Sequence, residues 1–347
     1  MNSRFLAIVF VFILVGCGAL LTPRPQTPTE RPYVIEEVRI RSEGGVVLAG
    51  EYTRPRGDGP FTGVVLITGS GPHDRDQNVA GHRTNLVLSD HLTKAGYAVL
   101  RFDDRGVNES SGEYATADLH DFAGDAAAAM AWLKAREEID AERVGYIGTS
   151  EGGMIAPVAA QVESANFMIF LAAPVRPLFP DVLVDQSVDL SRQQGARPDE
   201  IAMEIEQLTT VTSILRQRQP LSDIRADLDA YLVTQRLTRR ERSAVLSLFG
   251  TRWAMSYANQ NPAEPLREFH GPVLALFADL DRQVFASREA PLMRGYLSHP
   301  LSEVRTFEGL NHLFQPTETG SIEEYPFIET TIAPHVLNYI SRWMADR

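Results

Sequence analysis

Residues 143–153 read RVGYIGTSEGG, an apolar run that ends in a serine with one glycine two positions before it and another two positions after it. Serine is a mediocre core residue, and three glycines within six positions weaken any strand or helix. Such a backbone is typical of a sharp strand-to-helix turn, whose flanking positions must be small because they press against neighbouring backbone. We therefore expect Ser150 to stand at the tip of this turn, with its hydroxyl above the edge of a sheet.

The chain on both sides of this turn alternates between strand-like and helix-like patterns. Several strand-like runs are almost wholly apolar, as expected when helices cover both faces of a sheet. The predicted strands are 33–40, 46–52, 62–70, 97–104, 143–150, 166–174, 271–279 and 302–309, and the predicted helices are 84–95, 118–137, 151–163, 287–297 and 328–346. This alternation predicts an α/β fold with a mostly parallel sheet of roughly eight strands.

Residues 175–265 interrupt the alternation. They show no convincing strand pattern but several amphipathic helical ones, such as PDEIAMEIEQLTTVTSILRQR (198–218). The stretch holds eleven Arg and twelve Asp plus Glu, so it carries no strong charge of either sign. We expect a helical cap that lies over the strand ends and is inserted between two parts of the core, 33–174 and 266–347.

A serine hydroxyl is a weak nucleophile without a neighbouring base. In this architecture the partners follow the nucleophile in the order serine, acid, histidine. Of the four histidines after Ser150, His270 leads into a strand, His299 precedes a proline and His335 lies in the final helix. His312 follows the last predicted strand on a loop that would reach the edge of the sheet at Ser150, so we expect His312 to be the base.

The acid is expected after the preceding strand, where ADLDRQV (278–284) offers Asp279 and Asp281. Asp279 abuts the strand and is placed to cap the turn, whereas Asp281 lies further along the loop and is freer to reach a histidine. We favour Asp281 and keep Asp279 as the alternative. The carboxylate would hold the tautomer of the imidazole and stabilise the imidazolium that forms during attack.

Two backbone N–H groups are expected to bind the negative oxygen of the reaction intermediate. One is that of Glu151, which starts the helix after the serine. The other is expected in the loop TGSGPHDRDQN (68–78), where Ser70 is favoured over Gly71. The polar residues 73–76 of this loop either line the mouth of the site or form a local ion-pair cluster, and the sequence favours neither reading.

The N-terminus has the layout of a secretory signal. Arg4 precedes an apolar stretch from Phe5 to Gly16, and the chain's single cysteine, Cys17, follows. LVGC (14–17) resembles a bacterial lipobox, in which the cysteine becomes the lipid-modified first residue. We expect 1–16 to be a lipoprotein signal peptide. The alternative is an uncleaved membrane anchor, whose apolar run to Leu21 is at the short end for a bilayer span.

Residues 17–32 contain prolines at 23, 25, 28 and 32 and no apolar periodicity, which predicts an extended tether between lipid and folded body. With Cys17 lipidated no cysteine remains, so export here involves no disulfides. The net charge of −12 argues against nucleic acid as a partner. We expect an exported lipoprotein of the bacterial cell envelope, on the periplasmic side or the cell surface, held to the membrane by its N-terminal lipid.

Together these features resemble the serine hydrolases of the α/β-hydrolase superfamily, and within it a bacterial group of esterases and S33-type serine-aminopeptidase-like hydrolases. The matching segments are GSGPHDRD (69–76), LRFDDRGVNESSGEY (100–114), GTSEGG (148–153), ADLDRQV (278–284) and GLNHLFQ (309–315). The resemblance runs over most of 33–347 and is weakest in the insertion. It implies Ser150 as nucleophile, His312 as base and Asp281 as acid, in agreement with their positions.

The chain departs from this group at a few positions. The group more often has His in place of Thr149, Gly in place of Ala278 and a Gly-Lys pair in place of Asn108-Glu109. None of these changes removes a catalytic group, although the first alters the pocket beside the serine. Arg105 matches a position that the resemblance implies to be structural.

The reaction implied is acyl transfer, as in a carboxylesterase acting on small or short-chain acyl esters, with neither a metal nor an organic cofactor. A peptidase, an aminopeptidase or a thioesterase is the alternative, because the same triad serves amides and thioesters. A binding lipoprotein that keeps the triad only as architecture belongs to a different class and is less favoured. The oligomeric state is left open by the sequence.

Overall fold

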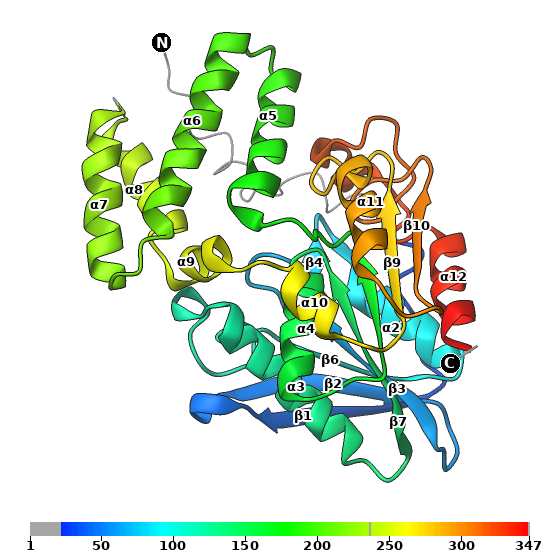
Figure 1. Cartoon of the computed structure of the whole chain (residues 1–347). Coiled ribbons are helices and arrows are strands. Elements are labelled where there is room, and N and C mark those ends of the chain that lie inside the picture. Colours follow the sequence, from blue (N-terminus) through cyan, green and yellow to red (C-terminus); the bar gives the residue numbers. More distant parts are fainter. Residues whose placement is uncertain (1–21, 236, 346–347) are drawn as a thin grey trace. The chain divides into compact units, whose positions relative to one another are not determined.

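The run RVGYIGT lies near the middle of a sheet, in strand β7 (Ile139–Thr149), where residues 144–148 are buried. Burial on both faces explains why polar side chains are excluded from this run. The computed structural model describes residues 22–235 and 237–345 of the chain (Figure 1). Strand β7 pairs in parallel with β3 (Phe61–Ile67) on one side and with β8 (Phe167–Leu171) on the other.

In the described part of the chain the main sheet has eight strands in the order β1-β2-β6-β3-β7-β8-β9-β10. The strands not yet given are β1 (Val34–Arg41), β2 (Val47–Arg54), β6 (Ala98–Phe102), β9 (Val273–Ala278) and β10 (Glu303–Phe307). Strand β2 is antiparallel to both β1 and β6, and every other pairing is parallel. The predicted α/β fold with a mostly parallel sheet is therefore confirmed.

Helices cover both faces of this sheet. The helices of the core are α2 (Thr84–Lys94), α3 (Leu119–Lys134), α4 (Gly152–Val162), α10 (Ala263–Glu268), α11 (Ala286–Tyr296) and α12 (Pro334–Ala345). One hydrophobic cluster joins α2 and α12 to the alternate strand residues that include Ile147 and Ile169. Helices α3 and α4 cover the opposite face (Figure 1). A Cβ at Gly63 of β3 would meet Leu133 of α3, and a Cβ at Gly153 of α4 would meet Phe170 of β8.

Two local features differ from the sequence-based expectation. A short hairpin of β4 (Asn78–Val79) and β5 (His82–Arg83) lies in the loop after β3. The final helix begins at Pro334 rather than at residue 328. Proline suits the first turn of a helix, and the N–H groups of Thr331 and Ile332 donate to the side chain of Gln26 instead of to a helix.

Residues 176–262 form a second compact unit together with residues 115–119. It is built from a π-helical turn (Leu178–Val182) and the helices α5 (Leu183–Gln193), α6 (Pro198–Leu215), α7 (Leu221–Thr234), α8 (Arg239–Phe249) and α9 (Arg252–Asn259). The helical character expected for residues 175–265 is thus present in the described part of that segment.

Two kinds of contact hold this helical unit together. The Glu204 carboxylate of α6, which is buried, accepts hydrogen bonds from the hydroxyls of Ser187 and Ser191 on α5, the latter at 2.7 Å. The Phe179 ring contacts those of Phe249 and Trp253 edge-on, with 5.8 Å between ring centroids in each pair. A satisfied buried carboxylate and an edge-on aromatic cluster both favour one specific packing.

Residues 22–32 do not form a free tether. The Arg24 guanidinium donates to the carbonyl oxygens of Ala80 (3.0 Å), Pro326 (2.9 Å) and Ile328 (2.9 Å). Gln26 donates to the carbonyl oxygen of Ile332 at 2.7 Å. The prolines indicate an extended backbone, but the side chains of this segment bind it to loops of the core, so the described part of the predicted tether, residues 22–32, belongs to the folded body.

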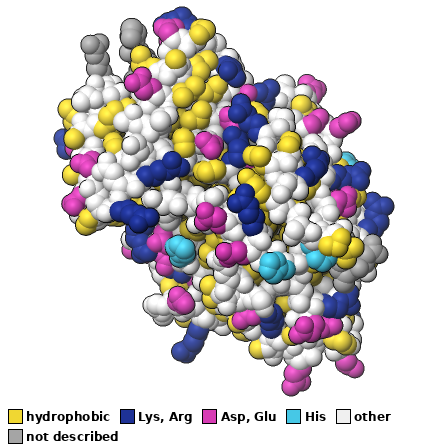
Figure 2. Space-filling model, in the orientation of Figure 1, with side chains coloured by type: hydrophobic (Ala, Val, Ile, Leu, Met, Phe, Trp, Pro, Cys, Tyr) yellow, Lys and Arg dark blue, Asp and Glu magenta, His cyan; other side chains and the backbone are white. Residues whose placement is uncertain are grey.

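The signal peptide predicted at 1–16 and the lipidation site predicted at Cys17 lie outside the described residues. None of the helices that the structure does describe is both long and apolar enough to cross a membrane. Charged side chains of both signs are interspersed over the face of the molecule drawn in Figure 2.

Candidate active site

The turn between β7 and α4 explains the two glycines around Ser150. A Cβ at Gly148 would lie 2.3 Å from the carbonyl oxygen of Gly152, and a Cβ at Gly152 would lie 2.5 Å from that of Ile67 and 2.6 Å from that of Thr68. Real Cβ atoms do not approach backbone so closely. The Ser150 backbone has a positive φ of 53°, a conformation that non-glycine residues rarely adopt. Such a conformation costs free energy and is found mostly at functional sites.

The backbone of Ser150 is fixed on several sides. Its N–H donates to the Leu171 carbonyl oxygen of β8 at 2.8 Å, and its carbonyl oxygen accepts the Gly153 N–H at 3.0 Å. A Cβ at Gly69 would lie 3.4 Å from the Ser150 Cβ, so the loop after β3 lies against the serine. The Ser150 residue itself is partly exposed.

His312 and Asp281 form a buried pair. His312 lies in the loop after β10, and its Nδ1 is 2.7 Å from Oδ2 of Asp281. The other carboxylate oxygen of Asp281 accepts the backbone N–H groups of Gln283 (2.7 Å) and Val284 (2.9 Å). Both carboxylate oxygens are thus engaged, and the ring orientation of His312 is set by the one that faces Nδ1.

His312 also lies beside the serine turn. His312 and Thr149, the residue before Ser150, line the same small cavity of about 20 Å³. This volume matches a single water molecule. Ser150, His312 and Asp281 therefore gather at the carboxyl ends of β7, β10 and β9.

Asp279 is engaged elsewhere. Its Oδ1 accepts the Gly309 N–H at 2.7 Å, and its own N–H donates to the Phe307 carbonyl oxygen at 3.0 Å. The residue is exposed, and its carboxylate caps the turn that follows β10. Asp281, rather than Asp279, is the carboxylate that contacts His312.

The two candidates for the second oxyanion donor, both in the loop after β3, differ in their hydrogen bonds. The Gly71 N–H donates to the Tyr114 hydroxyl at 3.1 Å. Within residues 22–235 and 237–345 the Ser70 N–H has no hydrogen-bond acceptor, while the Ser70 carbonyl oxygen lies 2.9 Å from Nε2 of His73. Glu151 is buried directly before α4, where its N–H belongs to the first turn.

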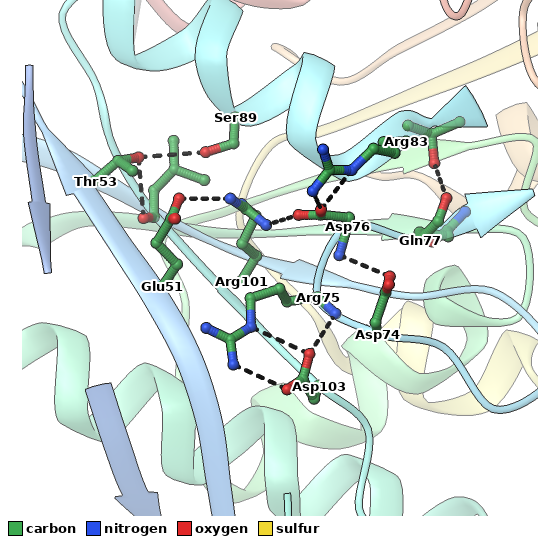
Figure 3. A network of polar contacts seen from close by, with 12 residues as sticks. Glu51, Thr53, Asp74, Arg75, Asp76, Gln77, Arg83, Ser89, Arg101 and Asp103 are labelled. Carbon is green, nitrogen blue, oxygen red and sulfur yellow. Dashed lines mark hydrogen bonds and ion pairs between the residues drawn. The ribbon is translucent and has the colours of Figure 1, made fainter. Parts of the chain in front are cut away.

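The polar residues that follow in this loop form an ion-pair network (Figure 3). Oδ1 of Asp103, at the end of β6, accepts the Arg75 N–H at 2.7 Å and its Nε–H at 3.1 Å. Asp76 pairs with the guanidinium groups of Arg101 and Arg83, and Arg101 pairs in turn with Glu51 of β2. Arg75 and Asp76 are thus held to β2 and β6 by charge, which favours the ion-pair reading for these two residues.

Asp104, the residue after Asp103, is buried. Its Oδ1 accepts the Thr68 hydroxyl at 2.7 Å, and its Oδ2 accepts the His73 N–H at 2.9 Å. Burial raises the pKa of Asp104 to about 8, and the nearby carboxylates of Glu151 and Asp125 add to the rise, while the two hydrogen bonds oppose it.

Sequence reasoning missed Asp103, Asp104 and Tyr114 as supports of the site. The available signal was the pair of aspartates directly after the buried run AVLRF (98–102), at the same edge of the sheet as Ser150. Their partners lie about thirty residues away in the loop after β3, and no local pattern indicates that pairing.

Among the residues that the structure describes, no cluster of three or more His, Cys, Asp or Glu side chains is arranged to hold a metal ion.

Comparison with known proteins identifies the family. A sequence profile described as X-Pro dipeptidyl-peptidase (S15 family) matches residues 44–264, well over half of the chain. The chain belongs to the S15 family. This makes it a hydrolase, and it confirms the superfamily resemblance, although the matching profile is S15 and not the S33-type group named from the sequence.

Individual proteins are also similar to this chain in sequence or in fold. Esterase EstD of Thermotoga maritima is 25% identical over 315 residues, which are 90% of this chain and 68% of that protein. An esterase of Pyrococcus furiosus has the same fold with a TM-score of 0.56 and 16% identity, over 92% of this chain and 94% of the other. The α/β hydrolase GrgF of Penicillium also reaches a TM-score of 0.56, with 16% identity over 90% and 98% of the two chains.

We predict that Asp104 makes the stability of this S15-family protein fall as the pH rises. Between its ordinary pKa of 3.8 and about 8, the folded protein holds a proton that the unfolded chain has lost. The free energy of unfolding then falls by up to about 1.4 kcal/mol per pH unit in this window. Urea unfolding at pH 5, 6, 7 and 8 should show a shallower fall for Asp104→Asn than for the wild type. Parallel curves for the two proteins would contradict the buried, protonated carboxyl.

Proposed function

We propose that this chain is a carboxylic ester hydrolase that works by acyl transfer through Ser150, His312 and Asp281. The observation that carries the proposal is the buried 2.7 Å contact between His312 and Asp281 beside a serine held at positive φ. A histidine that is oriented by a carboxylate and lies near a serine on a strained turn is the arrangement that can activate a hydroxyl. Membership of a hydrolase family supports the same reading.

The proposed reaction has two halves. In the first, His312 accepts the Ser150 proton through Nε2 while the serine oxygen attacks the carbonyl carbon, and the N–H groups of Ser70 and Glu151 stabilise the negative oxygen. The imidazolium, stabilised by Asp281, then protonates the leaving alkoxide, and an acyl-serine remains. In the second half His312 activates a water that releases the carboxylic acid and frees Ser150.

We propose small or short-chain acyl esters as the substrate class. Two of the relatives described above are named esterases, which supports an ester over other acyl compounds. Esters also react more readily than amides, because an alkoxide leaves more easily than an amine and demands less of the proton transfer by His312.

The second candidate is a peptidase that cleaves after proline. It is favoured by the description of the matching family profile, X-Pro dipeptidyl-peptidase. The same serine, histidine and carboxylate would serve an amide substrate, with His312 protonating an amine instead of an alkoxide. The two candidates differ in the leaving group and in recognition of a free amino terminus, so they can be separated by substrate.

A substrate series tests both candidates. We expect kcat/KM for nitrophenyl acetate and butyrate to exceed that for nitrophenyl laurate and for alanyl-prolyl nitroanilide. Ser150→Ala should retain less than about 10⁻³ of the wild-type rate on every substrate, because it removes the attacking oxygen. A rate that rises steadily with acyl length would overturn the short-chain assignment, and a faster reaction with the amide would establish the peptidase instead.

The two aspartates near His312 provide a matched pair of variants. Asp281→Asn should lower kcat for nitrophenyl butyrate by about 10³- to 10⁴-fold, because the amide favours the wrong imidazole tautomer. Asp279→Asn removes the same charge at a position two residues before Asp281, where the carboxylate only caps a turn. It should lower kcat by less than about 3-fold. The assignment of the acid is wrong if Asp279→Asn is the more damaging change.

We further propose that the protein is exported and anchored to the membrane through lipid on Cys17. The basic start, apolar stretch and LVGC tetrad support this, as argued from residues 1–17. Arg24 is fastened to the core only seven residues after Cys17. A fully extended chain spans at most about 3.6 Å per residue, so the folded body would lie within about 25 Å of the anchor.

Cell fractionation tests the anchor. We expect the wild type in the membrane fraction with a mass that reflects loss of residues 1–16 and gain of lipid. Cys17→Ala should shift the protein to soluble fractions or leave it unprocessed, since the lipid attachment atom is gone. Unchanged fractionation and mass in Cys17→Ala would rule out lipidation at this residue.

A further inference from the structure

The peptide unit between Ser70 and Gly71 is held at both ends by side chains. Its carbonyl oxygen lies 2.9 Å from Nε2 of His73, and its N–H donates to the Tyr114 hydroxyl at 3.1 Å. Burial lowers the pKa of His73, so the ring is neutral and Nε2–H donates to the Ser70 carbonyl oxygen. One residue earlier, the Gly69 N–H donates to Oε1 of Gln77 at 3.1 Å.

Tyr114 is firmly placed for this contact. Its ring packs against that of Phe122 with 5.1 Å between centroids, and it lines a small buried cavity with Gly69, Asp104 and Glu151. Burial raises the pKa of Tyr114 above its ordinary value, and the nearby carboxylate of Glu151 adds to the rise, so the hydroxyl stays neutral and accepts the Gly71 N–H.

Asp104 holds the same loop through hydrogen bonds to residues on both sides of the Ser70–Gly71 peptide. It accepts the Thr68 hydroxyl before the Ser70–Gly71 peptide and the His73 N–H after it, so it joins the two ends of this short loop. The Asp104 N–H donates back to the His73 carbonyl oxygen at 3.1 Å. The carboxyl group is thus bound to both sides of the segment that carries the Ser70 N–H.

The Ser70 N–H belongs to the peptide unit between Gly69 and Ser70. Gln77 holds the unit before it, and Tyr114 and His73 hold the unit after it, so these contacts restrict the direction of the Ser70 N–H. A peptide unit flanked by glycine rotates easily, and rotation of the Gly69–Ser70 unit would put the Gly69 carbonyl oxygen in the place of the Ser70 N–H. A carbonyl oxygen there would repel a negative oxygen, whereas an N–H stabilises it. The Tyr114 hydroxyl opposes that rotation indirectly, because it accepts the Gly71 N–H and so fixes the peptide unit that follows Ser70.

We propose that Tyr114, together with Asp104, is a positioning residue for the oxyanion-binding N–H of Ser70. This rests on the proposed function, because it assigns a role to the loop only if Ser150 performs acyl transfer. Tyr114 touches no reacting atom. It acts through the orientation of one peptide unit, so its loss reduces stabilisation of the transition state more than binding of the ester.

Tyr114→Phe removes only the hydroxyl oxygen. We expect kcat for nitrophenyl butyrate to fall about 10- to 100-fold with KM within about twofold, somewhat less than loss of an oxyanion donor itself. The inhibition constant of a short trifluoromethyl ketone, whose adduct with serine carries a negative oxygen, should rise by a similar factor. Tyr33→Phe is the matched control, because it removes a buried hydroxyl that contacts Arg31 and Asp90 instead.

Asp104 offers a second pair of variants that does not depend on Tyr114→Phe folding. Asp104→Ala removes both contacts and should lower kcat in the same selective way. Asp104→Asn should recover most of that loss, because an amide oxygen can accept the His73 N–H while its NH₂ donates to the Thr68 hydroxyl oxygen. Thermal unfolding of each variant identifies any that is not folded at the assay temperature.

The outcomes separate this inference from the proposed function. If the wild type hydrolyses no ester or amide and Ser150 is not labelled by a fluorophosphonate, the proposed function fails. If the wild type is active and folded Tyr114→Phe keeps its kcat and its affinity for the ketone, the positioning role fails. A rise in KM without a fall in kcat would also overturn the positioning role. If Tyr114→Phe is unfolded, equal rates for Asp104→Ala and Asp104→Asn would overturn it instead.

Discussion

Close backbone contact at Gly152 is the constraint on which the site depends. The first turn of α4 approaches the carbonyl oxygens of Ile67 and Thr68 so closely that no Cβ fits at Gly152. This contact brings the end of β3 against the serine turn, and the loop that continues from Thr68 therefore starts beside Ser150. Helix and strand can lie this close only because residues 148 and 152 have no side chain.

The parallel sheet then determines what else reaches Ser150. The carboxyl ends of β3, β6, β7, β9 and β10 meet at one edge, so loops far apart in sequence converge there. The contact between His312 and Asp281 was predictable for this reason, since a strand-like run precedes each of them. The choice between Asp281 and Asp279 was harder, because they differ by only two positions and the Gly309 N–H that engages Asp279 is thirty residues away.

What the sequence could not predict is mostly side-chain pairing across long separations. Arg24 and Ile328 are 304 positions apart, and a proline-rich stretch indicates only that no helix or sheet forms locally. Tyr114 and Gly71 are 43 apart, and neither carries a local signal for a hydrogen bond between a hydroxyl and a backbone N–H. Periodicity and turn chemistry therefore predicted the strands and the serine turn. The side chains that hold the loop after β3 could be recognised only from the three-dimensional structure.

Asp103 and Asp104 explain how one loop is held both by charge and by neutral hydrogen bonds. Successive residues leaving a strand point to opposite sides, so the two carboxyl groups enter different surroundings. Burial alone would raise the pKa of Asp103, but the hydrogen bonds and charge of Arg75 outweigh it and the pKa ends below its ordinary value. Among the described residues Asp104 pairs with no cation, and burial raises its pKa to about 8, which favours the neutral form at pH 7.

The ionised member of the pair therefore binds the outer part of the loop, where Arg75 is partly exposed. The neutral member binds the inner part, next to Ser70, without placing a negative charge beside the position where an oxyanion would form. If Ser150 performs the proposed acyl transfer, a carboxylate ionised at that inner position would oppose the developing charge, so burial of Asp104 would serve the electrostatics of the site as well as its geometry.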